Sequence, residues 1–411
     1  MSEPHPELIF DWNARSRIAG RRAPSVSIDD ETLRDGLQSP SVDDPPLEGK
    51  LRLLHLMGTL GIGSADVGLP AAGGRAASDA EALCREIVSG RLPIAPNCAA
   101  RTVERDIEAV LAIQERVGTP VEIMLFLGSS PIRCTVEGWS VDELVRRTER
   151  AVSLAVSHGA PATFVTEDTT RSHPEVVRRL YQAAVRCGAT RVCIADTAGH
   201  ADPLGTHRLV RLVRRAVDAA GGAAVGVDWH GHNDRGLAVA NALTAARAGA
   251  DRLHATVRGI GERVGNPPLE QLLVNIRLLG WASPDLTHLM EYVSVASELL
   301  GIAIPPGAPV VGRDAFRTST GVHAAAIMKA SETGRRELVD LVYSAVPASW
   351  VGRTQEIEVG PMSGASNARH WLRQQGLPET RGLIARVLRA AKDAHRVLSE
   401  SELRSLVRLR S

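Results

Sequence analysis

The chain has 411 residues, of which 44% are hydrophobic and 23% are charged, the balance of a folded globular protein. Its formal net charge is +1, so bulk charge gives no reason to expect binding to nucleic acid or to a membrane surface. Aromatic residues make up only 3% of the chain, and we therefore expect a core of Ala, Val, Leu and Ile.

The beginning of the chain and its cysteines set an expectation for location. The N-terminal stretch MSEPHPELIFDWNARSRIAG has no apolar core of signal-peptide length, and no run of about twenty apolar residues is present to span a bilayer. The five cysteines form no CxxC pair, which argues against a disulfide framework. We expect a cytoplasmic protein.

Eight short apolar runs with strand character alternate with segments of helical spacing. They are SVSID (25–29), IGSADV (62–67), LPIAP (92–96), VEIMLFL (121–127), ATFVT (162–166), RVCIAD (191–196), AVGVDWH (224–230) and RLHATV (252–257). This alternation predicts an α/β protein with parallel βαβ units, and eight units over about 250 residues fit a (β/α)8 TIM barrel. A doubly wound sheet would give the same alternation.

The pattern changes after about residue 282, where helical segments and a Pro/Gly-rich connection replace the strands. We expect an N-terminal extension (1–24), a catalytic barrel (25–282) and a mainly helical C-terminal linker and lid subdomain (283–411). SESE from Ser399 is a capping-box pattern before the last helix, whose arginines we interpret as a solvated face.

Polar clusters follow the predicted strands at six places, namely DDETLRDGLQ, DVGLP, TEDTTR, DTAGH, HGHND and GIGERVGN. In a TIM barrel the carboxyl ends of the strands carry the chemistry. The six clusters therefore predict one active site at that end of the barrel.

His230 and His232 stand two residues apart, a spacing that turns both imidazoles to the same side of a strand. Together with the carboxylate of Asp35 they can form a divalent metal site, to which Asn266 offers a side-chain oxygen. Arg34 can bind an anionic substrate group or a developing oxyanion. The alternatives are two hydrogen-bonded histidines at a strand end and a structural ion pair between Arg34 and Asp35.

In combination, DETLRDGLQ, TEDTTRS, DTAGH, HGHNDRGLAVANALTAARAGA and TVRGIGERVGNPPLE resemble the barrel signatures of the 2-isopropylmalate synthase and homocitrate synthase family. The likeness runs from about Val26 to Glu270 and continues in STGVHAAAIMKA and VGRTQEIEVGPMSG. The resemblance implies a Claisen-type condensation of acetyl-CoA with a 2-oxo acid, followed by thioester hydrolysis. It also implies a divalent metal ion (Mg²⁺, Mn²⁺ or Zn²⁺) and a homodimer whose lid reaches the partner's barrel.

The same resemblance implies roles for individual residues. The metal ligands are Asp35, His230 and His232, with Asn266 as a near or weak ligand. Arg34 stabilises the developing alkoxide, and Glu167, His323 and Tyr343 transfer protons. The expected substrate-binding residues are Gln38, Arg133, Arg171 and Thr197, the last of which alternatively only closes a turn.

Three departures from the family pattern bear on the reaction. Asp66 stands where the family often has Glu, and the loop RGIGERVGN lacks the catalytic Cys of the lyase branch, which favours a synthase over a lyase or aldolase. Isopropylmalate synthases commonly have a His where LGSSPIRC places Arg133, and a cation there favours an anionic acceptor such as 2-oxoglutarate, oxaloacetate or phosphonopyruvate. The alternatives are 2-oxoisovalerate as acceptor, with Arg133 pairing on the surface, and a non-catalytic scaffold, against which the intact motifs argue. We also expect no feedback inhibition by leucine.

Overall fold

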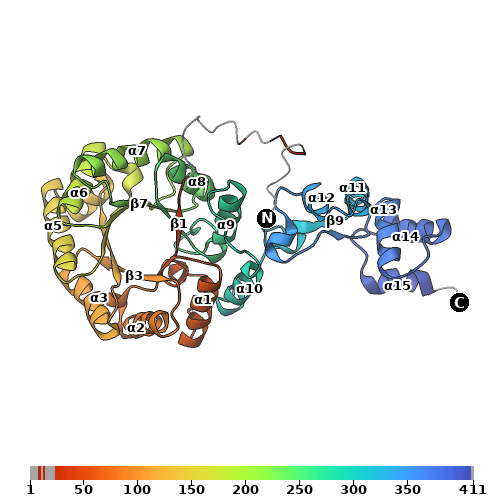
Figure 1. Ribbon diagram of the computed structural model, residues 1–411, viewed down its shortest axis with the longest axis horizontal. Helices are drawn as coiled ribbons and strands as arrows, with labels where there is room; N and C mark the ends of the chain where they lie inside the picture. The colour runs from red at the N-terminus through yellow and green to blue at the C-terminus, as the bar shows by residue number, and fades with distance from the viewer. Residues whose placement is uncertain (1–7, 11–12, 14–23, 409–411) are drawn as a thin grey trace.

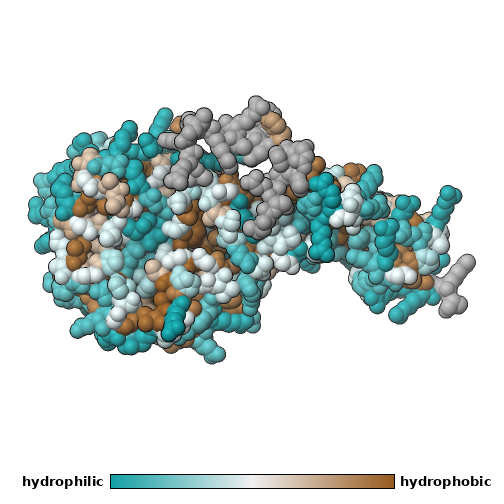
Figure 2. All heavy atoms as spheres, viewed as in Figure 1, coloured by the Kyte–Doolittle hydropathy of each residue, from teal (hydrophilic) through white to brown (hydrophobic). Residues whose placement is uncertain are grey.

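The computed structural model describes residues 8–10, 13 and 24–408, so most of the predicted N-terminal extension lies outside the described residues. A barrel with a surrounding ring of helices forms one end of the molecule, and the C-terminal segment extends away from it (Figure 1). Hydrophilic side chains dominate the outer helices in Figure 2, while hydrophobic ones gather toward the inside of the ring. None of the described helices is long and apolar enough to cross a membrane.

Eight parallel strands close into a barrel in the order of the sequence. They are β1 (Ser27–Asp30), β2 (Ser64–Asp66), β3 (Ala95–Arg101), β4 (Glu122–Gly128), β5 (Ala162–Glu167), β6 (Arg191–Asp196), β7 (Gly226–Gly231) and β8 (Arg252–Ala255). Strand β1 pairs with both β2 and β8, and this closure excludes the doubly wound sheet. The predicted TIM barrel is confirmed.

Amphipathic helices cover the outside of the barrel. They are α1 (Leu47–Thr59), α2 (Gly74–Ser89), α3 (Glu104–Val117), α4 (Pro131–Glu137), α5 (Val141–Ser157), α6 (Pro174–Arg186), α7 (Pro203–Ala219), α8 (Ala238–Ala248) and α9 (Leu269–Leu278). Local sequence begins several of them: Ser140 and Asp202 accept hydrogen bonds from the first-turn amides of α5 and α7, as N-caps do. Each cap fixes the point at which its helix begins.

The third strand was predicted at the wrong place. The apolar run LPIAP (92–96) only overlaps the beginning of β3, which continues through Asn97 to Arg101. Asn97 is fully buried because its side-chain amide donates to Asp29 in the barrel interior at 2.7 Å. A search for apolar runs misses a strand whose inward side chain is polar and satisfied by a partner far along the chain.

The C-terminal segment consists of α10 (Leu289–Leu299), α11 (Gly321–Glu332), α12 (Arg336–Leu341), α13 (Ala365–Gln374), α14 (Arg381–Asp393), α15 (Glu400–Arg408) and the short parallel pair β9 (Arg317–Thr318) and β10 (Glu356–Ile357). The barrel's apolar core extends along the chain as far as Val351. Buried side chains of α11 form a small separate cluster with Ile357, and α13–α15 bury a third one around Trp371 and Leu372. The predicted capping box is present, since the Glu402 carboxylate accepts from the Ser399 amide and the Ser399 hydroxyl accepts from the Glu402 amide.

Candidate metal centre and active site

Three predicted metal ligands converge at the carboxyl ends of β1 and β7. His230 Nε2 lies 3.5 Å and His232 Nε2 3.7 Å from Asp35 Oδ2, and the two imidazole nitrogens are 3.2 Å apart. The three donor atoms lie within 4.8 Å of one another, and all three residues are buried. Two imidazoles and one carboxylate form a donor set suited to a divalent metal ion.

Both histidines are held in a form that can bind metal. His230 turns Nδ1 toward the Glu31 carboxylate at 3.0 Å, which leaves Nε2 facing Asp35 and His232. Burial, together with the neighbouring His230, lowers the pKa of His232 to about 4 and keeps its imidazole neutral. Neutral imidazole is the ligating form, and a carboxylate behind a ligating histidine fixes its orientation.

Asn266, which was predicted as a near or weak ligand, lies beside the cluster. Its Nδ2 donates to Asp35 Oδ2 at 2.9 Å and to the Ile260 carbonyl at 3.1 Å, while its buried Oδ1 has no hydrogen-bond partner among the described residues. An orphaned buried oxygen beside a histidine–carboxylate cluster fits a cation at this place.

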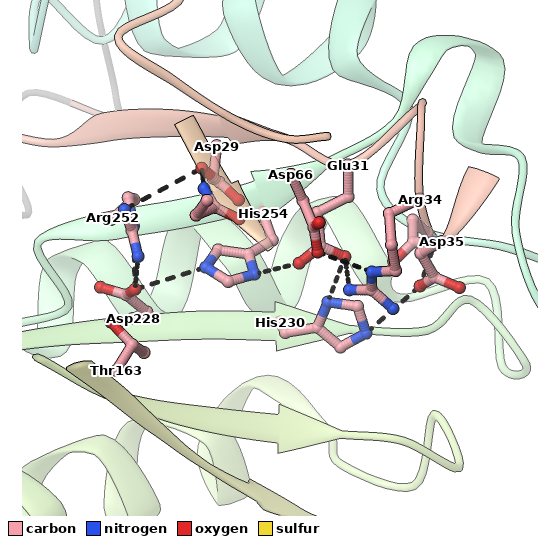
Figure 3. A network of polar contacts seen from close by, with 12 residues as sticks. Asp29, Glu31, Arg34, Asp35, Asp66, Thr163, Asp228, His230, Arg252 and His254 are labelled. Atoms are coloured by element: carbon pink, nitrogen blue, oxygen red, sulfur yellow. Dashed lines mark hydrogen bonds and ion pairs between the residues drawn. The ribbon is translucent and has the colours of Figure 1, made fainter. Parts of the chain in front are cut away.

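Arg34 is fixed beside the cluster by two carboxylates. Its Nη2 donates to Glu31 Oε2 and its Nε to Asp66 Oδ2, both at 2.7 Å, and its side chain is 17% exposed. Burial raises the pKa of Asp66 to about 7 against the opposing effect of Arg34. Asp66, at the position where the resemblance often implies Glu, contacts the guanidinium, and Arg34 is oriented toward the cluster (Figure 3).

A series of buried charged side chains connects the cluster to the barrel interior. Glu31 Oε1 contacts His254 Nδ1 at 2.7 Å, His254 Nε2 faces Asp228 at 3.4 Å, and Asp228 accepts from Arg252 (Figure 3). Burial opposes the charge of His254, but Glu31 and Asp228 raise its pKa to about 10.

Neither Glu31 nor His254 was predicted from the sequence. The available signal was the two-residue spacing of Asp228 with His230 and of Arg252 with His254, which turns each pair into the barrel.

Two other predicted residues, Glu167 and Arg133, form an ion pair at the carboxyl end of β5. Glu167 ends β5, and Arg133 on α4 places Nε 3.3 Å from the Glu167 carboxylate and Nη1 3.0 Å from Glu137. Burial raises the pKa of Glu167 against the opposing charge of Arg133. A Cβ added at Gly128 would lie 3.0 Å from Arg133 Nε, so the absence of a side chain there makes room for this arginine.

The remaining barrel residues take different positions. The Thr197 hydroxyl accepts from the backbone amide of Asp168 at 2.9 Å, and its own proton stays available for another acceptor. Arg171 donates two hydrogen bonds to the Asp168 carboxylate, both at 2.7 Å. Gln38 is exposed at the end of the short 3₁₀ helix after β1. Thr197, after β6, and Arg171, after β5, thus both contact Asp168, whereas Gln38 is exposed after β1.

His323 and Tyr343 are brought together, but away from the barrel of the same chain. Their rings stack with centroids 3.8 Å apart, on the C-terminal segment that extends beyond α10 (Figure 1). Tyr343 is 48% exposed. Within one chain, these two predicted proton-transfer residues are not part of the cluster around Asp35.

Fold and site together define a TIM-barrel protein with a carboxylate–histidine cluster, a candidate metal centre, at the carboxyl ends of its strands. Residues 25–295 match the HMGL-like family, and the chain belongs to that family. It is 33% identical over 371 residues to a probable 2-isopropylmalate synthase from Methanopyrus kandleri, covering 90% of this chain and 69% of that protein. It is 32% identical over 389 residues to homocitrate synthase AksA from the same organism, covering 93% and 92%. A crystal structure of Bacillus subtilis HMG-CoA lyase shares the fold with a TM-score of 0.58 and 20% identity, covering 69% of this chain and 97% of that one.

Proposed function

We propose that the protein is a metal-dependent acetyl-CoA:2-oxo acid synthase, which joins the two substrates and then hydrolyses the thioester. The observation that carries the proposal is the buried cluster of Asp35, His230 and His232 with Arg34 fixed beside it. Relatives that match most of the chain are named 2-isopropylmalate synthase and homocitrate synthase, which supports a synthase over a lyase.

The barrel residues hold the 2-oxo acid in this proposal. Asp35, His230 and His232, with Asn266 nearby, would hold a divalent ion such as Mg²⁺, Mn²⁺ or Zn²⁺, which supplies a Lewis acid that polarises the ketone. Arg34 donates to the ketone oxygen as it becomes an alkoxide, because its guanidinium is already oriented by two carboxylates and needs no reorganisation. The Thr197 hydroxyl donates a hydrogen bond to the carboxylate of the 2-oxo acid.

Proton transfer needs a group that accepts the proton leaving the methyl carbon of acetyl-CoA. Glu167 is half-buried with a raised pKa, a condition that suits a carboxylate for general base catalysis. The stacked pair of His323 and Tyr343 acts in the barrel of a second copy, since it lies outside the barrel of its own chain. The proposed assembly is therefore a homodimer in which the segment 283–411 acts as a lid over the partner's site.

In this proposal, Arg133 determines which 2-oxo acid the enzyme accepts as its second substrate. Its partly exposed side chain on α4 would bind the distal anionic group of 2-oxoglutarate, oxaloacetate or phosphonopyruvate after exchanging Glu137 for the substrate. The second candidate acceptor is 2-oxoisovalerate. It is favoured by the existing pairing of Arg133 with two carboxylates, which already neutralise its charge.

The test is a panel assay with purified protein, acetyl-CoA, a divalent metal ion and each 2-oxo acid, in which released CoA thiol is measured. We expect thiol release that depends on the 2-oxo acid and disappears in Asp35→Asn. Arg133→His should raise the KM of an anionic acceptor by about tenfold while the KM of acetyl-CoA changes little. Release with 2-oxoisovalerate alone would reject the role of Arg133, and no release with any acceptor would reject the proposed function.

A further inference from the structure

Arg263 connects the three loops that follow β6, β7 and β8. It belongs to the loop GIGERVGN after β8, and its Nε and Nη2 donate to the two carboxylate oxygens of Asp234, after β7, both at 2.9 Å. Nη2 also donates to the backbone carbonyl of Thr197, after β6, at 2.5 Å. One guanidinium therefore joins loops at the carboxyl ends of three consecutive strands, and no step of the proposed reaction uses it.

The backbone of Arg263 is in an unfavourable conformation that its surroundings maintain. Its φ is +55°, in the left-handed region, which residues other than glycine rarely adopt. Such a conformation persists only where neighbouring contacts fix it. Here the Gly265 amide donates to the Glu262 carbonyl, and the Gly265 carbonyl accepts from the Asn233 amide, both at 2.9 Å. The loop that carries Arg263 is thus attached to the segment after β7 by its backbone as well as by the guanidinium.

The loop after β6 packs directly against Asp234. Gly199, in the motif DTAGH, has a φ of +57°, and a Cβ added there would lie 2.8 Å from the backbone nitrogen and the side chain of Asp234. The His232 amide also donates to the Asp196 carbonyl at 3.2 Å. These contacts hold Thr197 in a fixed position relative to the candidate metal ligand His232.

Thr197 is restrained through both its backbone and its hydroxyl group. Its carbonyl accepts from Arg263, and its hydroxyl oxygen accepts from the Asp168 amide at 2.9 Å. The hydroxyl proton stays available for another acceptor. Arg263 also lies within electrostatic reach of the cluster, because its pKa is raised mainly by the hydrogen bonds with Asp234 and additionally by the charge of Asp35.

We propose that Arg263 is a positioning residue, which acts through Thr197 to place the hydroxyl group that binds the carboxylate of the 2-oxo acid. This inference rests on the proposed function, in which that hydroxyl donates to the carboxylate. Arginine suits the task because its planar guanidinium presents donors in fixed directions, so that it can hold the Asp234 carboxylate and the Thr197 carbonyl at the same time. The side chain of Arg263 is 42% exposed, so its ion pair contributes little to the stability of the fold and its main effect is on position.

The first measurement is the steady-state kinetics of Arg263→Gln with 2-oxoglutarate, oxaloacetate, phosphonopyruvate and 2-oxoisovalerate. We expect the KM of every acceptor that the wild-type protein uses to rise about tenfold, and by a similar factor for each, because all four carry the same carboxylate. The KM of acetyl-CoA should change by less than about twofold. Arg263→Lys should not restore the acceptor KM, since an ammonium group lacks the fixed geometry of the guanidinium.

Two further variants guard against a general effect on the fold. Asp234→Asn keeps the arginine but removes the charge that orients it, and it should raise the same KM by a smaller factor. The matched control is Arg85→Gln, which removes an arginine that donates twice to Glu81 on α2, outside the barrel. This control should keep every KM within about twofold of wild type.

A double-mutant cycle with Thr197 tests the route of the effect. Thr197→Val should itself raise the acceptor KM, and adding Arg263→Gln should raise it by less than about twofold more, because the hydroxyl that Arg263 positions is already gone. Titration with Mn²⁺ should give similar affinities for Arg263→Gln and wild type, since Arg263 contacts none of the candidate ligands directly.

Three results would overturn this inference and leave the proposed function intact. They are an acceptor KM that is unchanged in Arg263→Gln and Asp234→Asn, effects of Arg263→Gln and Thr197→Val that multiply fully, and a loss of Mn²⁺ affinity in Arg263→Gln as large as that in His232→Ala. The last result would mean that Arg263 holds the metal ligands rather than Thr197. Failure of the wild-type protein to release CoA thiol with any of the four acceptors would overturn the proposed function itself.

Discussion

Replacing His254 tests whether the buried charge chain holds the site together. His254 is completely buried and touches Glu31 at 2.7 Å and Asp228 at 3.4 Å. Against the cost of burial, these carboxylates raise its pKa from 6.5 to about 10, a shift that corresponds to about 5 kcal/mol of differential stabilisation of the imidazolium. His254→Gln leaves both carboxylates without this cation, and breaking a buried pair in this way costs about 3–5 kcal/mol.

The sign of the pH dependence follows from the raised pKa of His254. The stabilisation is fully present below the unfolded value of 6.5 and is lost as the pH rises through about 10, where the folded imidazolium deprotonates. We therefore expect wild type to exceed His254→Gln in free energy of unfolding by several kcal/mol near pH 7, and this difference to shrink toward pH 10.

Equilibrium urea denaturation of both proteins across this pH range provides the free energies of unfolding. The matched control is His288→Gln, which removes a histidine from an exposed pair with Glu291 at 3.0 Å and should change the free energy of unfolding by less than about 1 kcal/mol. A difference between wild type and His254→Gln that stays constant from neutral pH to pH 10 would refute a charged His254. A difference as small as that of the control would refute the structural role of the pair.

Three further predictions concern the site and its assembly. Gly128→Ala should displace Arg133 and raise the KM of the 2-oxo acid several-fold, at a stability cost of about 1–3 kcal/mol, and an unchanged KM would argue against a substrate contact by Arg133. In metal titrations, Asn266→Ala should bind Mn²⁺ about tenfold more weakly and His232→Ala far more weakly still, whereas equal affinity in all three proteins would place the metal elsewhere. Mixing inactive His232→Ala with inactive His323→Ala should restore about a quarter of wild-type activity if each site uses residues of both copies, and no recovery after subunit exchange would reject sharing.

The sequence predicted the barrel because strand and helix periods alternate regularly along the chain. It left closure undecided, since the pairing of β1 with β8 joins residues more than two hundred positions apart and leaves no local trace. β3 was misplaced because its inward residue Asn97 is polar and is satisfied by Asp29 across the barrel. The spacing of hydrophobic residues along the sequence indicates which side chains are buried. It does not indicate which residues far apart in the sequence form hydrogen bonds with one another.

The candidate ligands were predictable for a related reason. His230 and His232 share a strand end, where a spacing of two residues fixes a common direction, and Asp35 belongs to a motif that follows another strand end. Glu31 lies four residues before Asp35 and was missed, because its role depends on touching His230 from another strand. The pairing of Arg133 with Glu167 was missed likewise, although each residue was singled out alone.

The fate of the acetyl carbon tests the proposed reaction most directly. Acetyl-CoA labelled with ¹³C in the acetyl methyl group is incubated with the protein, Mn²⁺ and each 2-oxo acid, and the products are followed by NMR. The account predicts that the label appears as a methylene carbon of a 2-hydroxy diacid or triacid, formed by wild type and not by Asp35→Asn. Label found only in acetate would show simple thioester hydrolysis and would contradict the condensation.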